Sequence, residues 1–354
     1  MYMNFIQGFN SSIFNTFRTA QRLISNTALL PAAIRTIKYQ KKAAKRRAQW
    51  LDDGLHVPPL IIYSVTKRCN LRCVGCYHHA QHRESNDLSI DRIRAFLGEA
   101  SELGISIMVL AGGEPLLRDD LLSILPDYPE ILFPIFTNGL IINEALASQF
   151  RKNRNIVPII SLEGPQDKTD TRRGDGMFTE ILQRFHLLDD ADIFFGASLT
   201  VTRANFDTVT EDEFVRDLTA RGVQVLVYVE YVPIESGTEN MILTSVQREQ
   251  LSQRLEQIRR DHSTLVINFP GDEEKLGGCL AAGRGFLHIS QDGSVEPCPA
   301  SPYSDTNIKE TSLKDALSSK FLKTIREEPH SLANSSSGCV LFDKVTWIKS
   351  LLTK

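Results

Sequence analysis

The chain has 354 residues, a formal net charge of −3, 42% hydrophobic residues and 23% charged residues. These values are ordinary for a soluble globular protein, and the length allows one large domain plus an appendage. No apolar run approaches the roughly 18–20 residues that a membrane-spanning helix needs. Six cysteines without a secretory signal peptide favour a reducing compartment, so we expect a cytoplasmic protein whose thiols are available to bind metal.

The first 50 residues are strongly basic, with nine Lys or Arg and no Asp or Glu, which leaves a net charge of −12 on the rest of the chain. Six apolar residues in this arm recur at helical spacing: Ile6, Phe9, Ile13, Phe17, Ala20 and Ile24. This combination suits a helix on the inner, anionic face of a membrane, and equally a helix packed on the acidic body of the protein. Nucleic acid is not expected, because no binding motif accompanies the charge.

Apolar strand-like runs alternate with amphipathic helical stretches from Leu60 to about Leu265. The predicted strands are Leu60–Val65, Ser106–Ala111, Leu132–Thr137, Val157–Leu162, Phe194–Val201 and Val225–Val232. The predicted helices are Ile90–Leu103, Leu121–Asp127, Glu144–Arg151, Phe178–Leu188, Glu211–Arg221 and a polar helix that ends near Asp261. Capping boxes are predicted at Thr210 and Thr244. Six βα units favour a parallel sheet, either a partial barrel or a doubly wound sheet.

Three cysteines, Cys69, Cys73 and Cys76, follow the first predicted strand with the spacing C-x3-C-x2-C. Three thiolates can hold three irons of a four-iron, four-sulfur cluster and leave the fourth iron open, because such clusters normally take four cysteines. The alternative is structural zinc, with one of three nearby histidines as the fourth ligand. These histidines are His78, His79 and His82. Three unrelated buried thiols are disfavoured by the tight spacing.

This cysteine motif resembles the signature of the radical S-adenosylmethionine (radical SAM) enzymes. The resemblance implies an α/β fold, a partial (β/α)6 TIM-like barrel. It also implies a 4Fe-4S cluster whose open iron chelates S-adenosylmethionine. Electron transfer, from a donor such as flavodoxin or ferredoxin, then cleaves the cofactor to methionine and a 5′-deoxyadenosyl radical that abstracts hydrogen from substrate.

Three strand-end turns extend the resemblance. Gly112-Gly113-Glu114-Pro115 resembles the family's Gly-Gly-Glu-Pro motif, which implies contacts to the amino group of the cofactor. Asn138, in a Thr-Asn-Gly turn, and Ser161, in a Ser-Leu-Glu-Gly-Pro turn, are further implied cofactor contacts. The stretch 170–178 resembles the family's Arg-Gly…Gly-x-Phe continuation. Glu163 and Thr169 depart from the family pattern, where Asp and His are frequent.

The remaining cysteines, Cys279, Cys298 and Cys339, surround a predicted hairpin with a turn at Asp292-Gly293. This region resembles the auxiliary-cluster domain of the SPASM or shorter Twitch type, without its later cysteine-rich run. Either the three cysteines hold a second cluster whose fourth ligand is non-cysteine, exogenous or the substrate, or the domain has lost its cluster.

The expected organisation is a basic helical arm at 1–54, a radical SAM core at 55–265 and a SPASM/Twitch-like domain at 266–354. The leading hypothesis is a radical enzyme acting on a large or membrane-associated substrate, a peptide or a lipid. The alternative is a non-catalytic iron–sulfur or zinc protein that uses the arm for interactions. No proton donor or acceptor is assigned, and Tyr228 and Glu230 on the sixth strand are the only candidates.

Overall fold

A computed structural model describes residues 29–81, 86–328, 332 and 338–353 of the chain. The apolar stripe predicted between Ile6 and Ile24 lies outside these residues, and so does His82. Within the described ranges, no helix has the length and apolar character needed to cross a membrane.

Nine strands form one open sheet in the order β7-β6-β5-β4-β3-β2-β1-β8-β9. Their bounds are β1 Leu60–Ser64, β2 Ile107–Ala111, β3 Phe133–Thr137, β4 Ile156–Leu162, β5 Gly196–Val201, β6 Val225–Glu230, β7 Leu265–Phe269, β8 Phe286–Ile289 and β9 Val295–Glu296. Strands β1 to β7 are parallel to their neighbours and follow one another in chain order. All six predicted strands are confirmed, whereas β7 was not predicted and extends the sheet beyond β6.

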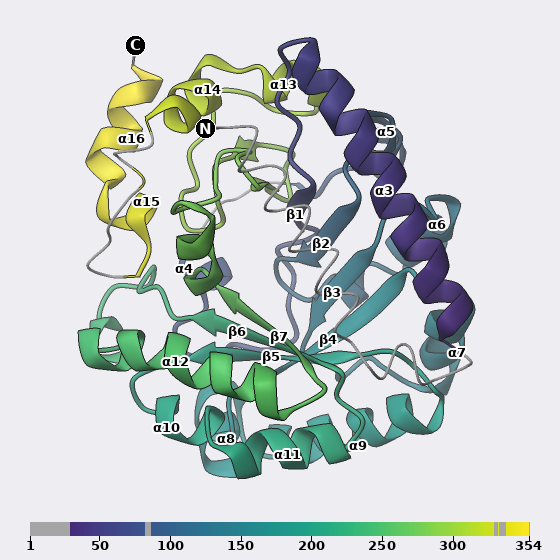
Figure 1. Cartoon of the computed structure of the whole chain (residues 1–354), viewed down its shortest axis with the longest axis vertical. Coiled ribbons are helices and arrows are strands. Elements are labelled where there is room, and N and C mark those ends of the chain that lie inside the picture. Colours follow the sequence, from purple (N-terminus) through teal and green to yellow (C-terminus); the bar gives the residue numbers. More distant parts are fainter. Residues whose placement is uncertain (1–28, 82–85, 329–331, 333–337, 354) are drawn as a thin grey trace.

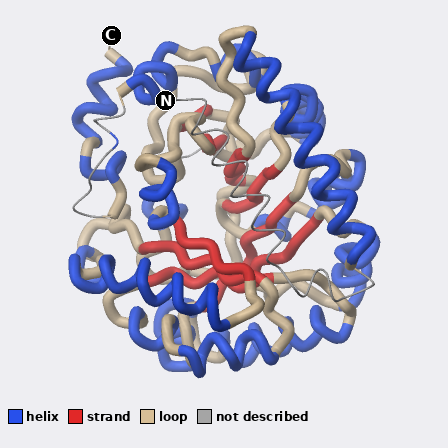
Figure 2. Tube along the Cα trace, in the orientation of Figure 1, coloured by secondary structure: helices blue, strands red, loops and turns tan. Residues whose placement is uncertain are grey.

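Helices surround the sheet, which curls into the predicted partial barrel (Figure 1, Figure 2). The helices of the barrel are α5 Ile90–Leu103, α6 Asp119–Ile124, α7 Glu144–Lys152, α8 Gln166–Arg173, α9 Met177–Asp190, α10 Phe206–Val209, α11 Asp212–Ala220 and α12 Ser245–Asp261. Short 3-10 turns at Pro115–Leu117, Leu125–Asp127, Glu239–Met241 and Gly271–Leu276 join some of these elements. The alternation of strand and helix therefore gives a curled sheet rather than a flat doubly wound one.

The two faces of the strands carry different side chains. Residues that face the helices join the main apolar core, for example Ile160 on β4 and Leu226 on β6. A separate apolar cluster lies on the other face and includes Val157, Ile159 and Val227. Because side chains alternate along a strand, Ser161 at the end of β4 shares this inner face. The predicted contact residue thus lies on the concave side of the barrel.

One of the two predicted capping boxes is present. The Thr244 side chain caps α12 and Gln247 reaches back to the Thr244 backbone, as the sequence predicted. The prediction at Thr210 is wrong, since the N-cap of α11 is Glu211, with no side-chain bond. The Thr210 hydroxyl instead donates to the Phe206 and Asp207 carbonyls, because the short helix α10 ends there and leaves these carbonyls available.

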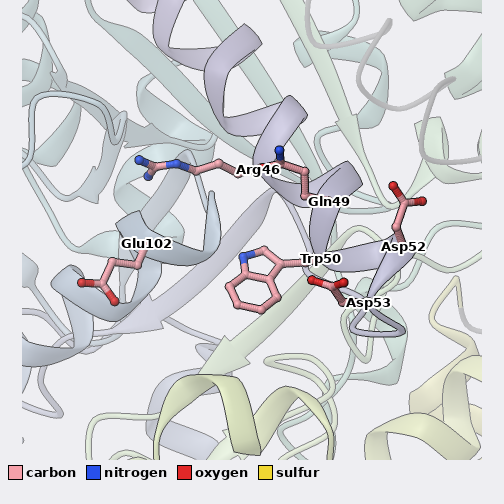
Figure 3. A pocket seen from close by; sticks show the side chains of 6 residues that line it. All are labelled: Arg46, Gln49, Trp50, Asp52, Asp53 and Glu102. Atoms are coloured by element: carbon pink, nitrogen blue, oxygen red, sulfur yellow. The ribbon is translucent and has the colours of Figure 1, made fainter.

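The second half of the basic arm packs on the barrel as α3 (Leu30–Asp52). Buried Arg47 donates to the Gly104 carbonyl at 2.6 Å, and buried Gln40 donates to the Ser106 carbonyl at 3.0 Å. Between α3 and α5, residues that include Trp50 and Glu102 line a surface hollow (Figure 3). Internal packing, one of the two alternatives for the arm, therefore holds for α3. Five cations on its outer face remain exposed: Arg35, Lys38, Lys41, Lys42 and Lys45.

The carboxyl-terminal region attaches to the barrel through the predicted hairpin. Strand β8 pairs in parallel with β1, and β9 returns antiparallel to β8 through a turn in which Gly293 has φ +90°. Helices α13 Leu313–Leu317, α14 Lys320–Glu327, α15 Val340–Asp343 and α16 Val345–Leu352 follow. The hairpin thus extends the barrel sheet beside β1, the strand that leads into the first cysteine motif.

A buried chain of side chains joins this hairpin to β1. The His288 ring on β8 bonds the Ser64 hydroxyl at 2.8 Å through Nε2 and the Glu296 carboxylate at 2.7 Å through Nδ1. All three residues are buried. These bonds fix the hairpin at the end of β1, immediately before the cysteine loop.

Candidate active site

The first cysteine motif forms a loop between the end of β1 and the short helix α4 (Tyr77–Ala80). Cys69, Cys73 and Cys76 are free thiols with partly exposed side chains. Burial raises the pKa of the Cys69 and Cys73 thiols above their usual range. The loop therefore presents three unbridged thiols at the carboxyl end of the sheet, where α/β barrels place their chemistry.

The Gly112-Gly113 turn after β2 packs against the backbone of residues 66–68, which lead into this loop. The Gly113 amide donates to the Thr66 carbonyl at 2.8 Å, and the Glu114 amide donates to the Arg68 carbonyl at 2.9 Å. A Cβ on Gly113 would lie 2.1 Å from the Arg68 carbonyl oxygen. Only glycine permits this approach, so the two predicted motifs form one unit.

Buried Glu114 ties this unit to the next strand end. One carboxylate oxygen accepts hydrogen bonds from the Thr137 hydroxyl at 2.7 Å and the Leu116 backbone N–H at 3.0 Å. The other accepts a hydrogen bond from the Asn138 backbone N–H at 2.8 Å. Burial raises the pKa of the Glu114 carboxyl. The Glu114 side chain is 1% exposed, and its carboxylate oxygens mainly accept the hydrogen bonds that hold the ends of β2 and β3 together.

The two other predicted contact residues also border the cysteine loop or the inner face. The side-chain amide of Asn138 donates a hydrogen bond to the side-chain oxygen of Asn70, within the first motif, at 2.7 Å. The Ser161 hydroxyl has no hydrogen-bond partner among the described residues, and its side chain is partly exposed. It is therefore free to bind a ligand on the inner face of β4.

Two arginines at the end of α8, which are not among the predicted site residues, hold the cysteine loop in place. Buried Glu163 binds Arg172 and Arg173 at 2.5 and 2.6 Å. Arg172 also exchanges hydrogen bonds with the Val74 backbone, and Arg173 Nη1 lies 4.0 Å from the Cys73 sulfur. The sequence could have indicated this ion-pair cluster, because Glu163 and Arg173 both lie in stretches after β4 that resemble the family pattern.

Tyr231, after β6, is a further residue that sequence reasoning missed. A Cβ on Gly75 would lie 2.5 Å from the Tyr231 hydroxyl oxygen, and Gly75 has φ +68°. Both facts require glycine at this position of the loop. The Tyr231 hydroxyl donates to Thr238 at 2.7 Å, which fixes the ring against the loop.

The sixth-strand candidates have other partners. The Tyr228 hydroxyl, within the helix-facing core, donates to the Val209 carbonyl at 3.0 Å. Glu230 forms a 2.6 Å ion pair with Arg248 of α12. Neither geometry favours a role as proton donor or acceptor on the inner face.

The second set of cysteines gathers around the hairpin, although these residues are up to 60 positions apart in the sequence. Burial raises the pKa of Cys279 and Cys298 well above the usual range and that of Cys339 to about 11, and the three thiols act on one another electrostatically. Glu273 lies beside them, and burial raises the pKa of its carboxyl to about 8. Thiols this buried are protonated at neutral pH unless a metal binds them.

Helix α4 lies between the two sets of cysteines. The Gln81 side chain, directly after α4, donates to the Pro299 carbonyl at 2.6 Å, next to Cys298. Tyr77, the residue after Cys76, lies close enough to Cys76 and Cys298 to interact electrostatically with both. The fold therefore brings the two motifs to the same end of the barrel.

In the part of the chain that the structure describes, no three His, Cys, Asp or Glu side chains converge as a single metal ion requires. A zinc ion bound by the first triplet with His78 or His79 would need such a convergence. An iron–sulfur cluster requires a different arrangement, because each thiolate binds a different iron and the ligands are therefore spaced around the cluster. Three free thiols on one loop fit such a group.

Comparison with known families agrees with this geometry. The sequence profile of the radical SAM superfamily matches residues 63–220. Residues 63–220 therefore form a domain of this superfamily. The profile of the SPASM iron–sulfur cluster-binding domain matches residues 279–340. This protein is therefore a radical SAM enzyme whose cofactors are a 4Fe-4S cluster and S-adenosylmethionine, which favours the catalytic hypothesis over the non-catalytic one.

Three curated relatives are 25–27% identical to this chain over the matched residues. The AdoMet-dependent heme synthase of Methanosarcina barkeri is 25% identical over 73% of this chain and 82% of its own length. The mycofactocin maturase MftC of Mycolicibacterium smegmatis is 26% identical over 72% of this chain and 67% of its own. The Fe-coproporphyrin III synthase of Methanosarcina barkeri is 27% identical over 51% of this chain, and the match spans about half (48%) of that relative.

A solved structure shows the same fold. Streptococcus suis SuiB, bound to its precursor peptide SuiA, superposes with a TM-score of 0.65 over 84% of this chain and 72% of SuiB. At 16% identity this likeness supports the architecture alone.

Replacing Glu114 with Gln is expected to destabilise the radical SAM core. A Gln side-chain NH2 would face the amide or hydroxyl donors that the carboxylate now accepts, and an unsatisfied buried group costs about 1–3 kcal/mol. We therefore expect a melting temperature several degrees lower. Glu144→Gln, at an exposed position on α7, is the control and should melt like the parent. Equal melting of both variants would contradict the structural role of Glu114.

Proposed function

We propose that this radical SAM enzyme modifies a peptide and that it carries two iron–sulfur clusters. Cys69, Cys73 and Cys76 hold the first cluster, which, with S-adenosylmethionine bound, supplies hydrogen-abstracting radical chemistry. Cys279, Cys298 and Cys339 hold the second.

The proposed cofactor contacts line the mouth of the barrel around the first loop. The Gly112-Gly113 backbone approaches the loop closely, and Pro115 begins the turn that holds Glu114 in place. Asn138 orients the turn through Asn70, and the available Ser161 hydroxyl donates to a polar group of the cofactor. The clamp of Arg172, Arg173 and Glu163 fixes the loop and places positive charge beside Cys73. An electron donor such as flavodoxin or ferredoxin delivers the electron.

The single observation that carries the peptide assignment is the combination of a radical SAM core with a SPASM match at 279–340. The match to the relative named as mycofactocin maturase spans 72% of this chain and 67% of that relative. A second candidate substrate is a tetrapyrrole, which the more complete match to the heme synthase favours.

The test is substrate-dependent turnover of S-adenosylmethionine. Reconstituted enzyme would be incubated with dithionite and, in separate reactions, with a precursor peptide encoded beside its gene or with Fe-coproporphyrin III. Peptide-dependent 5′-deoxyadenosine, together with a mass change in the peptide, would support the proposal. Turnover and product formed only with the tetrapyrrole would replace it with the second candidate.

The second cluster should be visible in the iron content. Reconstituted protein should contain more than four irons per chain, and the excess should survive replacement of the first three cysteines. Cys298→Ala should lower the count to that of one cluster, because it removes one of the three proposed cysteine ligands. Iron and sulfide analysis measures both. A count of four or fewer that is lost entirely with the first triplet would mean that the domain has lost its cluster.

The exposed cations of α3 lead us to propose peripheral association with an anionic membrane, where a membrane-anchored or lipid-like substrate would be accessible. Each cation near the headgroups contributes about 1 kcal/mol, and salt screens the attraction. Replacing Arg35, Lys38, Lys41, Lys42 and Lys45 with Gln should abolish co-sedimentation with anionic vesicles, while neutral vesicles should bind neither protein. Gln at exposed Lys309, Lys320 and Lys323 is the control. Unchanged sedimentation of the α3 variant would contradict the proposal.

A further inference from the structure

Glu273 is a buried carboxylate with an unused oxygen. It lies in the 3-10 turn after β7 and is 6% exposed. Its Oε2 atom accepts a bond from the Leu280 amide at 3.2 Å, whereas Oε1 has no hydrogen-bond partner among the described residues. A buried acceptor without a partner costs free energy, so its presence indicates a ligand at this position.

The surroundings of Glu273 supply the identity of that ligand. The Cys279 thiol faces the carboxylate, and both Cys298 and Cys339 lie within electrostatic range of it. Four candidate ligands for iron therefore surround one buried region, and they come from the turn after β7, the ends of the hairpin and the start of α15.

The local backbone holds the carboxylate in place. The Glu273 amide donates to the Pro270 carbonyl at 2.9 Å, and the Gly278 amide donates to the Glu273 carbonyl at 3.0 Å. Arg284 approaches the same turn but donates its Nη1 and Nη2 groups to the Cys279 and Gly277 carbonyls. These bonds fix the loop between Glu273 and Cys279, so that the carboxylate and the first thiol keep a constant spacing.

We infer that Glu273 is the fourth protein ligand of the second cluster and binds one iron through the carboxylate, an inference that rests on the proposed cluster at Cys279, Cys298 and Cys339. Carboxylates are established ligands of protein iron, and side chains other than cysteine complete some iron–sulfur clusters. Coordination would use the oxygen that lacks a partner in the protein and would close the iron to other small ligands.

The experiment uses the full chain with Ala at Cys69, Cys73 and Cys76, so that only the second cluster contributes to the signal. Glu273→Ala, Glu273→Gln and Glu273→Cys are compared with this parent. Asp272→Asn removes a neighbouring carboxylate that pairs with Arg259 at 2.6 Å and serves as the matched control. Iron content, thermal melting and the electron paramagnetic resonance spectrum of the reduced cluster are recorded with and without cyanide, a ligand for an open iron.

The parent and the Asp272 control should give the same spectrum with and without cyanide. The Ala and Gln variants should keep iron but show a cyanide-dependent spectrum, and the Cys variant should be insensitive again. A cyanide response in the parent, or none in the Ala and Gln variants at parental iron content, would overturn the assignment of Glu273. An iron-free parent would instead refute the second cluster itself, so the two failures are distinguishable.

Discussion

Alanine at Cys69, Cys73 and Cys76 together is expected to abolish reductive cleavage of S-adenosylmethionine. These thiols are the only cysteines on the loop between β1 and α4, and the other three lie in the carboxyl-terminal region. Without them no iron of the first cluster is held, so formation of 5′-deoxyadenosine under dithionite should fall to the level without enzyme. The measurement is chromatographic quantification of 5′-deoxyadenosine.

The matched control for this variant is alanine at Cys298 alone. That substitution removes a cysteine of the second set and leaves the first loop intact, so cleavage without substrate should continue. The comparison separates loss of the first cluster from a general effect of losing thiols. Full cleavage activity in the triple variant would contradict the assignment of the first site.

Gly113→Ala is expected to lower cofactor cleavage on the order of 10²-fold, the cost that a displacement of about 1 Å can have on a positioned group. The added Cβ would lie 2.1 Å from the Arg68 carbonyl oxygen, which belongs to the backbone and cannot rotate away. The turn after β2 must therefore separate from the residues that precede Cys69. Both the cleavage rate and the binding of S-adenosylmethionine should be measured.

Gly98→Ala provides the control, because it makes the same chemical change within helix α5. A Cβ at this position meets no atom within 4 Å. Alanine in a helix interior is favoured over glycine by roughly 0.5–1 kcal/mol, so this variant should be active and slightly more stable. Equal activity of the two variants would show that the close contact at Gly113 is not required.

Much of the barrel could be predicted because its signals are local. Strands such as Ile107–Ala111 are short, branched and apolar, and the helix Ile90–Leu103 has the predicted bounds, with Ser89 as N-cap and Gly104 in the left-handed region. Strand β7, Leu265–Phe269, was not predicted because the polar Asn268 interrupts a short apolar run. Pairing with β6, rather than composition, makes this segment a strand.

The role of α3 also depended on tertiary contacts. The arm's charge was evident from the sequence, but charge alone fits a membrane surface and an acidic protein body equally well. The contacts of Gln40 and Arg47 with backbone carbonyls near α5 decide that this helix packs on the barrel. Its outer face keeps the exposed cations, so the two alternatives describe opposite faces of one helix.

The sequence by itself determined the superfamily and predicted the first cysteine site, since the C-x3-C-x2-C spacing and the strand-end turns lie close together along the chain. Only the tertiary structure decided what surrounds them. Glu163 meets Arg173 beside Cys73, Tyr231 covers Gly75, and Glu273 joins three cysteines. Such contacts link segments whose separation in sequence carries no pattern. They form because the curled sheet brings the carboxyl ends of its strands, and the hairpin paired with β1, to one end of the barrel.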